Sequence, residues 1–218
     1  RAGFLGSYRI LEDVEPKIAP DEVELLREVL AKMQQGSAEL AAKFLSENLR
    51  QGGSAALNFI QANLLFQSGD VEGAKDQYLK AIEKENSFRR AYNNLGLLHV
   101  QQGELKQAVK HLSRAVELGE RSARSYGLLG YCFLKLENTL AAEESYRDAI
   151  VLDPENEQWR LGLAQTLMDS REYIEGVAMV QSLLVDDPAN LTYWKLIANA
   201  YIGLDQPRAA ASSLEMAR

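Results

Sequence analysis

The stretch that decides the fold runs from Arg89 to Ser122 and reads RRAYNNLGLLHVQQGELKQAVKHLSRAVELGERS. Its spacing of small and large residues recurs thirty-four residues earlier, where Ala62 and Ala74 stand in place of Gly96 and Ala108. It recurs again thirty-four residues later. A fixed period of about 34 residues is typical of a helical repeat array, in which each unit packs only against its neighbours.

Five copies of this pattern begin near Ala55, Arg89, Ala123, Glu157 and Leu191. The eighth residue of every copy is small: Ala62, Gly96, Gly130, Ala164 and Ala198. The twentieth is small as well: Ala74, Ala108, Ala142, Gly176 and Ala210. We expect the two helices of a copy to cross at these points, because a larger side chain would push the backbones apart. The twenty-fourth residue is larger and is expected to fill the space beside the crossing: Tyr78, Leu112, Tyr146, Val180 and Leu214.

The paired small and large positions resemble those of the tetratricopeptide repeat family. The resemblance covers roughly residues 54 to 218 and is most specific in the three copies from 55 to 156. It weakens from 157 to 190, and Arg171 and Asp205 replace the glycine that separates the two helices of earlier copies, as Gly69 and Gly103 do. Membership implies an all-α fold, a right-handed superhelical solenoid of antiparallel helix pairs with about twelve helices.

The chain divides into three segments on its local patterns. Residues 1–20 lack periodicity and are expected to be extended, since Pro20 restricts Ala19 to non-helical angles. Residues 21–53 hold two helical stripes, broken at Gly36 and ended by Gly52 and Gly53, and are expected to form a degenerate capping helix pair. Residues 54–218 form the array of about five repeats, the last one truncated. Because the chain stops at Arg218 inside a helical pattern, we expect it to be a piece of a longer protein.

Composition excludes several classes of function. The net charge of -7 argues against a general nucleic-acid binder, which needs many phosphate-neutralising cations. No apolar run reaches the ~18 residues that span a bilayer, so no membrane insertion is expected. Cys132 is the single cysteine, which rules out an internal disulfide. The expected protein is soluble, and the sequence leaves its compartment open between the cytoplasm and a bacterial periplasm.

No catalytic or metal-binding constellation stands out, so the chain is predicted not to be an enzyme and to need no cofactor. His99 is predicted to be a core or boundary histidine, and His111 to be exposed on the next helix. With these two and Cys132, no metal-ligand spacing exists. Cys132 is predicted to be a buried, inert thiol.

The resemblance also implies a concave surface lined by the first helix of each repeat. The candidate partner-binding residues on it are Phe59, Asn63, Phe66, Arg90, Asn93, Asn94, Leu97, Arg124, Gly127, Tyr131, Leu134 and Lys135. The residue at the twelfth position of each repeat is apolar in every copy: Phe66, Val100, Leu134, Met168 and Ile202. This stripe indicates either a groove for an apolar peptide or packing between neighbouring first helices.

Arg90 and Arg124 occupy the same position of consecutive repeats in an acidic chain. Two stacked guanidinium groups would hold an acidic side chain or a C-terminal carboxylate; the alternative is two solvated arginines. Some family members grip a peptide's C-terminal carboxylate with a clamp of five residues. Asn63, Asn94 and Arg124 match three of its places, whereas Phe59 and Leu128 stand where cations are expected. We therefore predict that the chain is not a chaperone-tail receptor of that kind.

Gly127 leaves a place on this predicted surface without a side chain, which indicates either room for a ligand or no function at all. The predicted function is a protein–protein interaction scaffold whose partner is a protein or peptide with acidic and apolar groups. The alternatives are an architectural segment of a larger repeat protein and an accessory module of an enzyme complex. Self-association is expected through the uncapped C-terminal end, at Leu214 and Ala217.

Overall fold

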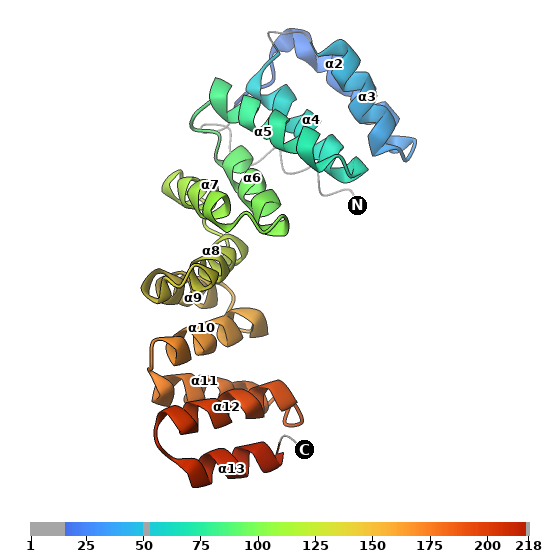
Figure 1. Cartoon of the computed structure of the whole chain (residues 1–218). Helices are drawn as coiled ribbons and strands as arrows, with labels where there is room; N and C mark the ends of the chain where they lie inside the picture. The colour runs from blue at the N-terminus through green and yellow to red at the C-terminus, as the bar shows by residue number, and fades with distance from the viewer. Residues whose placement is uncertain (1–15, 50–52, 217–218) are drawn as a thin grey trace. The chain divides into compact units, whose positions relative to one another are not determined.

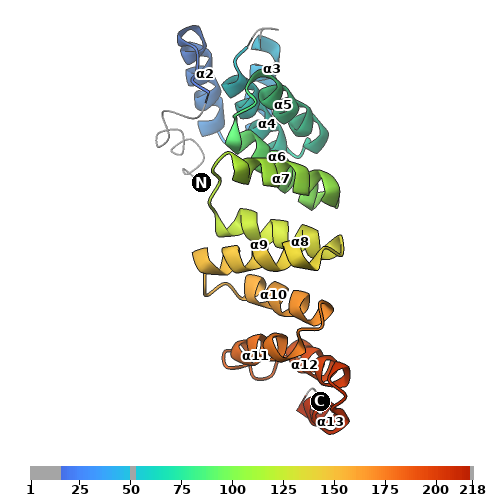
Figure 2. The same ribbon diagram turned by 90° about the vertical axis from the view of Figure 1, so that its left-hand side faces the viewer.

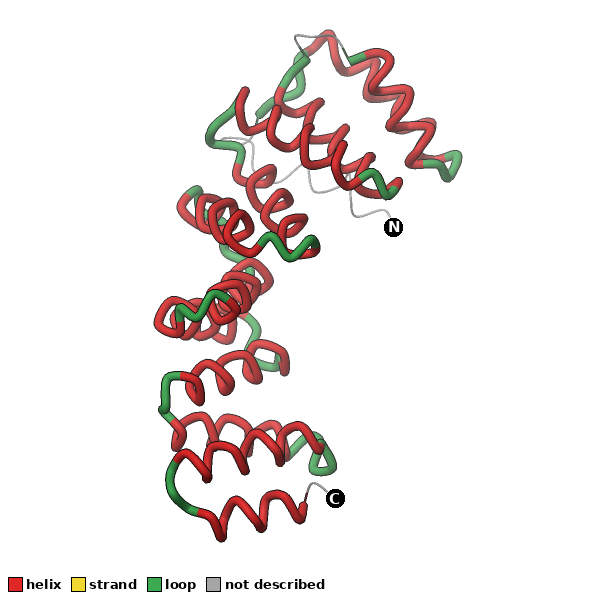
Figure 3. Tube along the Cα trace, viewed as in Figure 1, coloured by secondary structure: helices red, strands yellow, loops and turns green. Residues whose placement is uncertain are grey.

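The computed structural model describes residues 16–49 and 53–216, and these contain helices and loops without any strand (Figure 3). A short 3-10 helix, η2 (Pro20–Glu22), is followed by twelve α-helices. Their bounds are α2 Val23–Gln34, α3 Ala38–Asn48, α4 Ala55–Ser68, α5 Val71–Lys84, α6 Arg89–Gln101, α7 Leu105–Glu117, α8 Ala123–Lys135, α9 Thr139–Leu152, α10 Glu157–Asp169, α11 Tyr173–Leu184, α12 Leu191–Gly203 and α13 Pro207–Met216. The fold is an all-α helical repeat of the solenoid type (Figure 1).

Two compact units make up the chain. Unit 1 contains η2 to α6 together with Lys110–Glu120, and unit 2 contains Gly103–Val109 together with α8 to α13. Within each unit, consecutive helices pack against each other, as α8, α9 and α10 do in unit 2 (Figure 2). Each unit is described by itself below.

The first helices of the five repeats begin at the residues that the sequence marks: Ala55, Arg89, Ala123, Glu157 and Leu191. Side chains that accept hydrogen bonds from the first-turn backbone N–H groups cap several of these helices, among them Ser54, Ser122, Asn156 and Asn190. Such caps satisfy donors that have no partner inside the helix. In the N-terminal pair, α3 ends at Asn48, before the predicted glycine stop, of which Gly52 lies outside the described residues.

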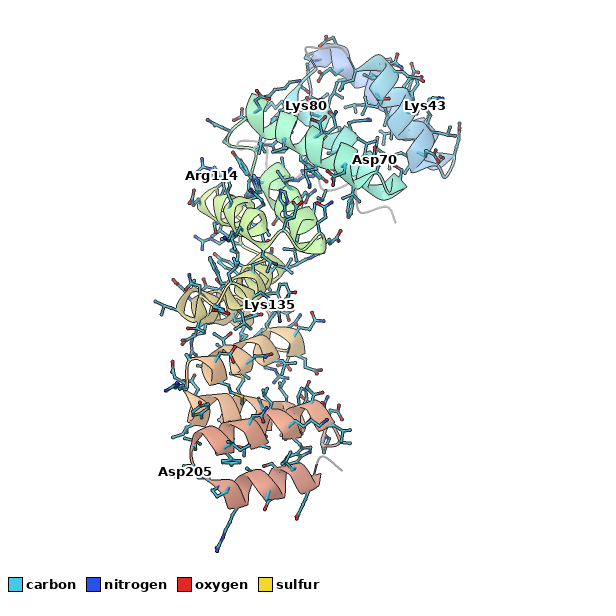
Figure 4. All side chains as sticks on the ribbon, viewed as in Figure 1. Lys43, Asp70, Lys80, Arg114, Lys135 and Asp205 are labelled. Atoms are coloured by element: carbon cyan, nitrogen blue, oxygen red, sulfur yellow. The ribbon has the colours of Figure 1, made fainter. Side chains whose placement is uncertain are left out.

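The turn inside each repeat needs one residue in the left-handed conformation. Gly69 and Gly103 supply it with φ of 90° and 73°. At the equivalent position of the three later repeats, Glu137, Arg171 and Asp205 adopt φ of 62°, 68° and 58° (Asp205 is labelled in Figure 4). The left-handed region is costly for a residue with a Cβ, so these three turns are strained where the earlier two are not.

Close packing in unit 1 follows the predicted small and large positions. A Cβ on Gly96 would lie 2.6 Å from Cγ of Leu112, so the absence of a side chain on α6 lets Leu112 fill the space beside it. Leu112 is fully buried, as are Ala62 and Ala74. The N-terminal helices are tied to the array by Glu22, whose carboxylate accepts hydrogen bonds from the backbone N–H and the hydroxyl of Ser54 at 2.7 and 2.6 Å.

In unit 2 the buried ring of Tyr146 fits between two glycines. A Cβ on Gly130 would lie 2.8 Å from this ring, and one on Gly162 would lie within 2.7 Å of its other end. Burial raises the pKa of the Tyr146 hydroxyl well above its ordinary value. The same principle acts between α10 and α11, where a Cβ on Gly176 would approach the carbonyl oxygen of Ala164 to 3.3 Å.

Both histidines are buried, which corrects one sequence-based prediction. His99 is buried as expected, but His111 is equally buried at 5% exposed, because its ring stacks on that of His99 with centroids 5.2 Å apart. Burial first, and then the nearby His99 and Lys110, lower the pKa of His111 from 6.5 to about 4. Cys132 is buried as predicted, and burial raises the pKa of its thiol to about 11.

Candidate functional site

The twelve candidate binding residues fall into two groups that belong to different units. The group in unit 1 lies on α4 and α6, and the group in unit 2 lies on α8. The members in unit 1 are Phe59, Asn63, Phe66, Arg90, Asn93, Asn94 and Leu97. The members in unit 2 are Arg124, Gly127, Tyr131, Leu134 and Lys135.

Phe59 on α4 is part of the core of unit 1. Its ring centroid lies 5.8 Å from that of Tyr78 and 4.9 Å from that of Phe88. The guanidinium carbon of Arg90 lies 5.1 Å from the same centroid, a cation–π contact. Arg90 therefore packs on an aromatic side chain of its own unit, in addition to any role in binding.

Asn63 and Asn94 meet at the hydroxyl of Tyr78. This hydroxyl donates to Oδ1 of Asn63, and Nδ2 of Asn94 donates to the same oxygen at 3.0 Å and to the Tyr78 hydroxyl at 3.3 Å. Asn63 and Tyr78 are both buried, and burial raises the pKa of Tyr78 to about 12. The two amides that match the carboxylate clamp thus serve first to satisfy a buried tyrosine.

The other candidates in unit 1 are more accessible. Phe66, near the end of α4, is 38% exposed. Asn93 and Leu97 on α6 are half-buried. Among the predicted binding residues of unit 1, Phe66 is therefore the most exposed to solvent.

On α8 in unit 2, three predicted residues form an exposed stripe: Arg124, Tyr131 and Lys135. They are seven and four residues apart, which places them on one face of the helix. Nζ of Lys135 lies 5.9 Å from the centroid of Tyr131, which is 39% exposed (Lys135 is labelled in Figure 4). Leu134 is half-buried beside them. An exposed aromatic ring flanked by two cations suits an acidic segment that also carries an apolar side chain.

Gly127 does not leave a vacant place on this surface, which corrects the interpretation that it makes room for a ligand. A Cβ at Gly127 would lie 2.4 Å from ring atoms of Trp159 on α10. The indole fills the space, and Gly127 is there to let α8 and α10 approach each other. This contact could have been predicted from the sequence only with the knowledge that the third residue of one repeat, here Trp159, faces the fifth residue of the preceding repeat, here Gly127.

A second exposed stripe runs along α10, which packs against α8. It consists of Gln158, Gln165 and Asp169, at the same repeat positions as the stripe on α8. Partial burial raises the pKa of Asp169, and the nearby positive charge of Lys135 opposes this shift. Asp169 was not among the predicted binding residues, although it occupies the same repeat position as Lys135, one period of 34 residues later. The two stripes together form the α8–α10 face.

Two classes of site are not found in the described part of the chain. No group of three or more His, Cys, Asp or Glu side chains in residues 16–49 and 53–216 could hold a metal ion. Over the same residues, every helix is too short or too polar to cross a lipid bilayer.

Stacked helix pairs that repeat every thirty-four residues define a solenoid-type helical repeat protein. Three family models match this chain, one described as TPR repeat over residues 62–103 and two described as Tetratricopeptide repeat over residues 93–157 and 133–200. Together they extend over residues 62–200. The chain belongs to the tetratricopeptide repeat family.

Among similar proteins is human intraflagellar transport protein 70A, which is 40% identical over 83 residues, covering 38% of this chain and 12% of that protein. The Arabidopsis thaliana tetratricopeptide repeat domain-containing protein PYG7, chloroplastic, is 24% identical over 163 residues, covering 72% of this chain and 53% of its own length. The chain therefore spans only part of these relatives.

Solved structures confirm the fold. YrrB, described as a TPR protein with an unusual peptide-binding site, superimposes with a TM-score of 0.74 at 23% identity, covering 83% of this chain and 92% of its own. MamA superimposes with a TM-score of 0.68 at 20% identity, covering 75% and 89%.

Proposed function

We propose that the α8–α10 face of unit 2 binds a peptide segment of a protein partner that carries acidic and apolar side chains. A protein-interaction scaffold is the role that the repeats and the related structures support. The finer proposal rests on one observation: the exposed Arg124–Tyr131–Lys135 stripe in a chain whose net charge is -7. That the chain is not an enzyme stays a prediction.

The charge of Arg124 supports the proposal because no carboxylate of the described residues pairs with it. Some arginines elsewhere in the described residues do pair with carboxylates, as Arg114 does with Glu117 at 2.8 Å and Arg147 with Glu143 at 2.9 Å. Arg124 makes no salt bridge with any described residue. A solvated guanidinium group is available for a bidentate contact with a carboxylate.

Tyr131 adds the apolar part of the recognition. Its ring stands between Arg124 and Lys135 on the same helix face, and Leu134 and Leu161 are half-buried on the two helices that form this face. Tyrosine loses little conformational entropy when it binds and contributes a large contact area. An extended peptide that alternates acidic and apolar residues would match both the cations and the ring.

The proposal is tested with peptides selected from a random library displayed on phage against the purified chain. The selected peptides should be rich in Asp or Glu with an interspersed aliphatic or aromatic residue. Fluorescence anisotropy of the best peptide should show binding at least tenfold weaker to Arg124→Glu/Lys135→Glu, since each charge-assisted contact is worth roughly 1.5–3 kcal/mol. The affinity should also fall as salt is raised from about 0.05 to 0.5 M.

The matched control is Arg208→Glu, which reverses an exposed arginine on α13 away from this face. It should leave the affinity unchanged. Equal losses in the control and the double variant, or full binding by the double variant, would show that the α8–α10 face is not the site. Arg90 is a poor probe, because its guanidinium group packs on Phe59 and its replacement would also disturb the core of unit 1.

A further inference from the structure

The indole of Trp159, near the start of α10, covers the middle of α8. A Cβ on Gly127 would lie 2.4 Å from Cε3 and Cζ3 of this indole and 2.6 Å from Cδ2. The ring therefore lies where a side chain of residue 127 would stand. Gly127 is buried, whereas Trp159 is only half-buried, so part of the covering residue remains accessible to solvent.

The place that the indole covers belongs to the exposed stripe of α8. Gly127 follows Arg124 by three residues and precedes Tyr131 by four, and residues with these spacings share one face of a helix. Arg124 and Tyr131 are both exposed. An aromatic side chain from the next repeat thus lies between a cation and a second aromatic ring.

Packing, without a hydrogen bond, holds the indole in place. Trp159 packs against a buried core cluster of unit 2 that consists of Tyr146, Leu163 and Leu167. Its Nε1 atom is buried and has no hydrogen-bond acceptor among the described residues. By contrast, Nε1 of Trp194 on α12 donates to the carbonyl oxygen of Pro188 at 2.9 Å. The Trp159 indole is therefore free to adjust when a ligand covers it.

The half-buried ring is particular to this pair of helices. At the same repeat position on α12, Tyr193 is 2% exposed and its hydroxyl donates to Glu157. That ring is used up in the interior of unit 2. Only on the α8–α10 face does the third residue of the later repeat, Trp159, keep part of its surface in contact with solvent while lying over a glycine.

We propose that Trp159 determines specificity at the α8–α10 face by packing against a large apolar side chain of the peptide, two positions from an acidic residue held by Arg124. This inference rests on the proposed function, because it requires a peptide on this face. A carboxylate over the indole would lose water without gaining a hydrogen bond, whereas an apolar side chain gains from leaving water there.

The spacing follows from the geometry of a helix and of an extended peptide. Arg124 and Gly127 are three residues apart, which is about 4.5 Å along the axis of α8. Every second residue of an extended peptide faces the same side, and such residues are about 6.6 Å apart. The residue two positions from the acidic one is therefore the one that reaches the indole, while the residue between them points away.

The fluorescence of Trp159 tests the contact without altering it. The chain has two tryptophans, so Trp194→Phe leaves Trp159 as the only one. A tryptophan-free peptide from the phage selection should shift the emission to shorter wavelength and reduce quenching by acrylamide, with the midpoint that anisotropy gives. In Trp159→Leu, which retains Trp194, the emission should not change. Trp194→Phe is also the matched control and should bind like the natural chain.

Self-association would also alter the emission and is controlled separately. It is expected at the C-terminal end of the array, where Leu214 is exposed and Ala217 lies outside the described residues. Light scattering of the chain with and without peptide, at the concentrations of the titration, should show a constant mass apart from the bound peptide. A shift in emission at constant mass is then due to the peptide.

A double-mutant cycle separates a contact with the peptide from a structural role of the indole. Trp159→Leu keeps an apolar residue against the core and should weaken binding of the selected peptide about tenfold. It should weaken binding of the same peptide, with its apolar residue changed to alanine, less than about twofold. Gly127→Ala, which displaces the indole without removing it, should discriminate between the two peptides in the same direction.

Circular dichroism and melting temperature verify that each variant is folded, and if Trp159→Leu is not, the cycle with Gly127→Ala and the emission of Trp159 decide. Equal losses for the two peptides, unchanged emission at saturating peptide, or selected peptides without an apolar residue two positions from an acidic one would overturn this inference. The proposed function would survive these results if Arg124→Glu/Lys135→Glu still weakens binding. Full binding by that double variant would refute both.

Discussion

Tyr78 in unit 1 and Tyr146 in unit 2 occupy the same repeat position and are equally buried, yet their surroundings differ. The hydroxyl of Tyr78 draws in Asn63 and Asn94, whereas Tyr146 fits between Gly130 and Gly162. Asn63 is consequently buried on α4. Its counterpart on α8, Tyr131, stays exposed.

The comparison teaches that repeat position alone does not decide which first helix offers a binding face. On α4 the residues facing the next repeat are used to complete the core, with Arg90 over Phe59 and two amides around Tyr78. On α8 the packing is done by Gly127 and Gly130, and Arg124, Tyr131 and Lys135 stay exposed. We therefore place the candidate binding face on α8 and α10.

The packing of Tyr146 between two glycines in unit 2 should be disrupted when a side chain is added to one of them. In Gly162→Val, the new side chain overlaps the ring of Tyr146, and we expect the free energy of unfolding to fall by roughly 3 kcal/mol. Urea unfolding followed by circular dichroism measures the loss. Adding Tyr146→Leu, the residue type that Leu112 supplies in unit 1, should recover part of it; an unchanged stability in Gly162→Val would refute this packing.

The hydrogen bonds that two asparagine amides make around Tyr78 in unit 1 should be disrupted when one amide is removed. Asn63→Ala leaves the buried Tyr78 hydroxyl without its acceptor, which we expect to cost about 1–3 kcal/mol of unfolding free energy. Tyr78→Phe in the same background should restore part of it, because the buried hydroxyl is then gone and only the half-buried amide of Asn94 has lost its acceptors. Tyr146→Phe is the matched control in unit 2, and a loss there as large as in Asn63→Ala would contradict the contrast between the two tyrosines.

Acid should weaken unit 1, because His111, whose pKa burial lowers, lies in it. His111 stays neutral in the folded chain down to about pH 4, while the unfolded chain takes up this proton below its ordinary pKa of 6.5. The unfolded state binds more protons between these values, so the stability is fully present above pH 6.5 and is lost as the pH falls toward 4.

We expect the melting temperature to fall by roughly 5 °C across that window, as read by differential scanning calorimetry. His111→Phe, which keeps a ring against His99, should flatten this dependence. A slope that is the same in His111→Phe as in the natural chain would assign the acid sensitivity to other groups.

The smallest effect concerns the turns. Arg171→Gly in unit 2 should raise the free energy of unfolding by about 0.5–1 kcal/mol, because glycine relieves the left-handed conformation. In unit 1 the reverse change, Gly69→Ala, should lower it by about 1 kcal/mol, since no neighbouring atom compensates for the strain. Thermal unfolding of the two variants measures both changes in stability. A change of the same sign in both would disprove the contrast between the strained and unstrained turns.

Much of the fold could be predicted from the period alone. The small residue at the eighth position and the large residue at the twenty-fourth predict the contact between Gly96 and Leu112. The first residue of each repeat's first helix follows from the spacing. Contacts that depend on particular side chains, within a repeat or between repeats, could not be predicted in this way. The burial of His111 depends on His99 presenting a parallel ring, and the filling of the space at Gly127 depends on Trp159 of the next repeat.

The candidate site was predicted as a set of repeat positions, which cannot distinguish a side chain that faces solvent from one that completes the core. Asn63 and Asn94 suit a carboxylate clamp by residue type, but their amides have a nearer partner in Tyr78. The stacking of Arg90 and Arg124 on one ligand stays a prediction.

The central claim is that the exposed aromatic residue on α8 contacts the partner and that the exposed aromatic residue on α4 does not. Phe66 and Tyr131 are matched for the test, at 38% and 39% exposed on first helices of different repeats. Each is replaced in turn by the photoreactive benzoylphenylalanine, and the selected acidic peptide is irradiated with each variant. The account predicts cross-linking from position 131 and none from position 66. Cross-linking from position 66, or none from position 131, would contradict it.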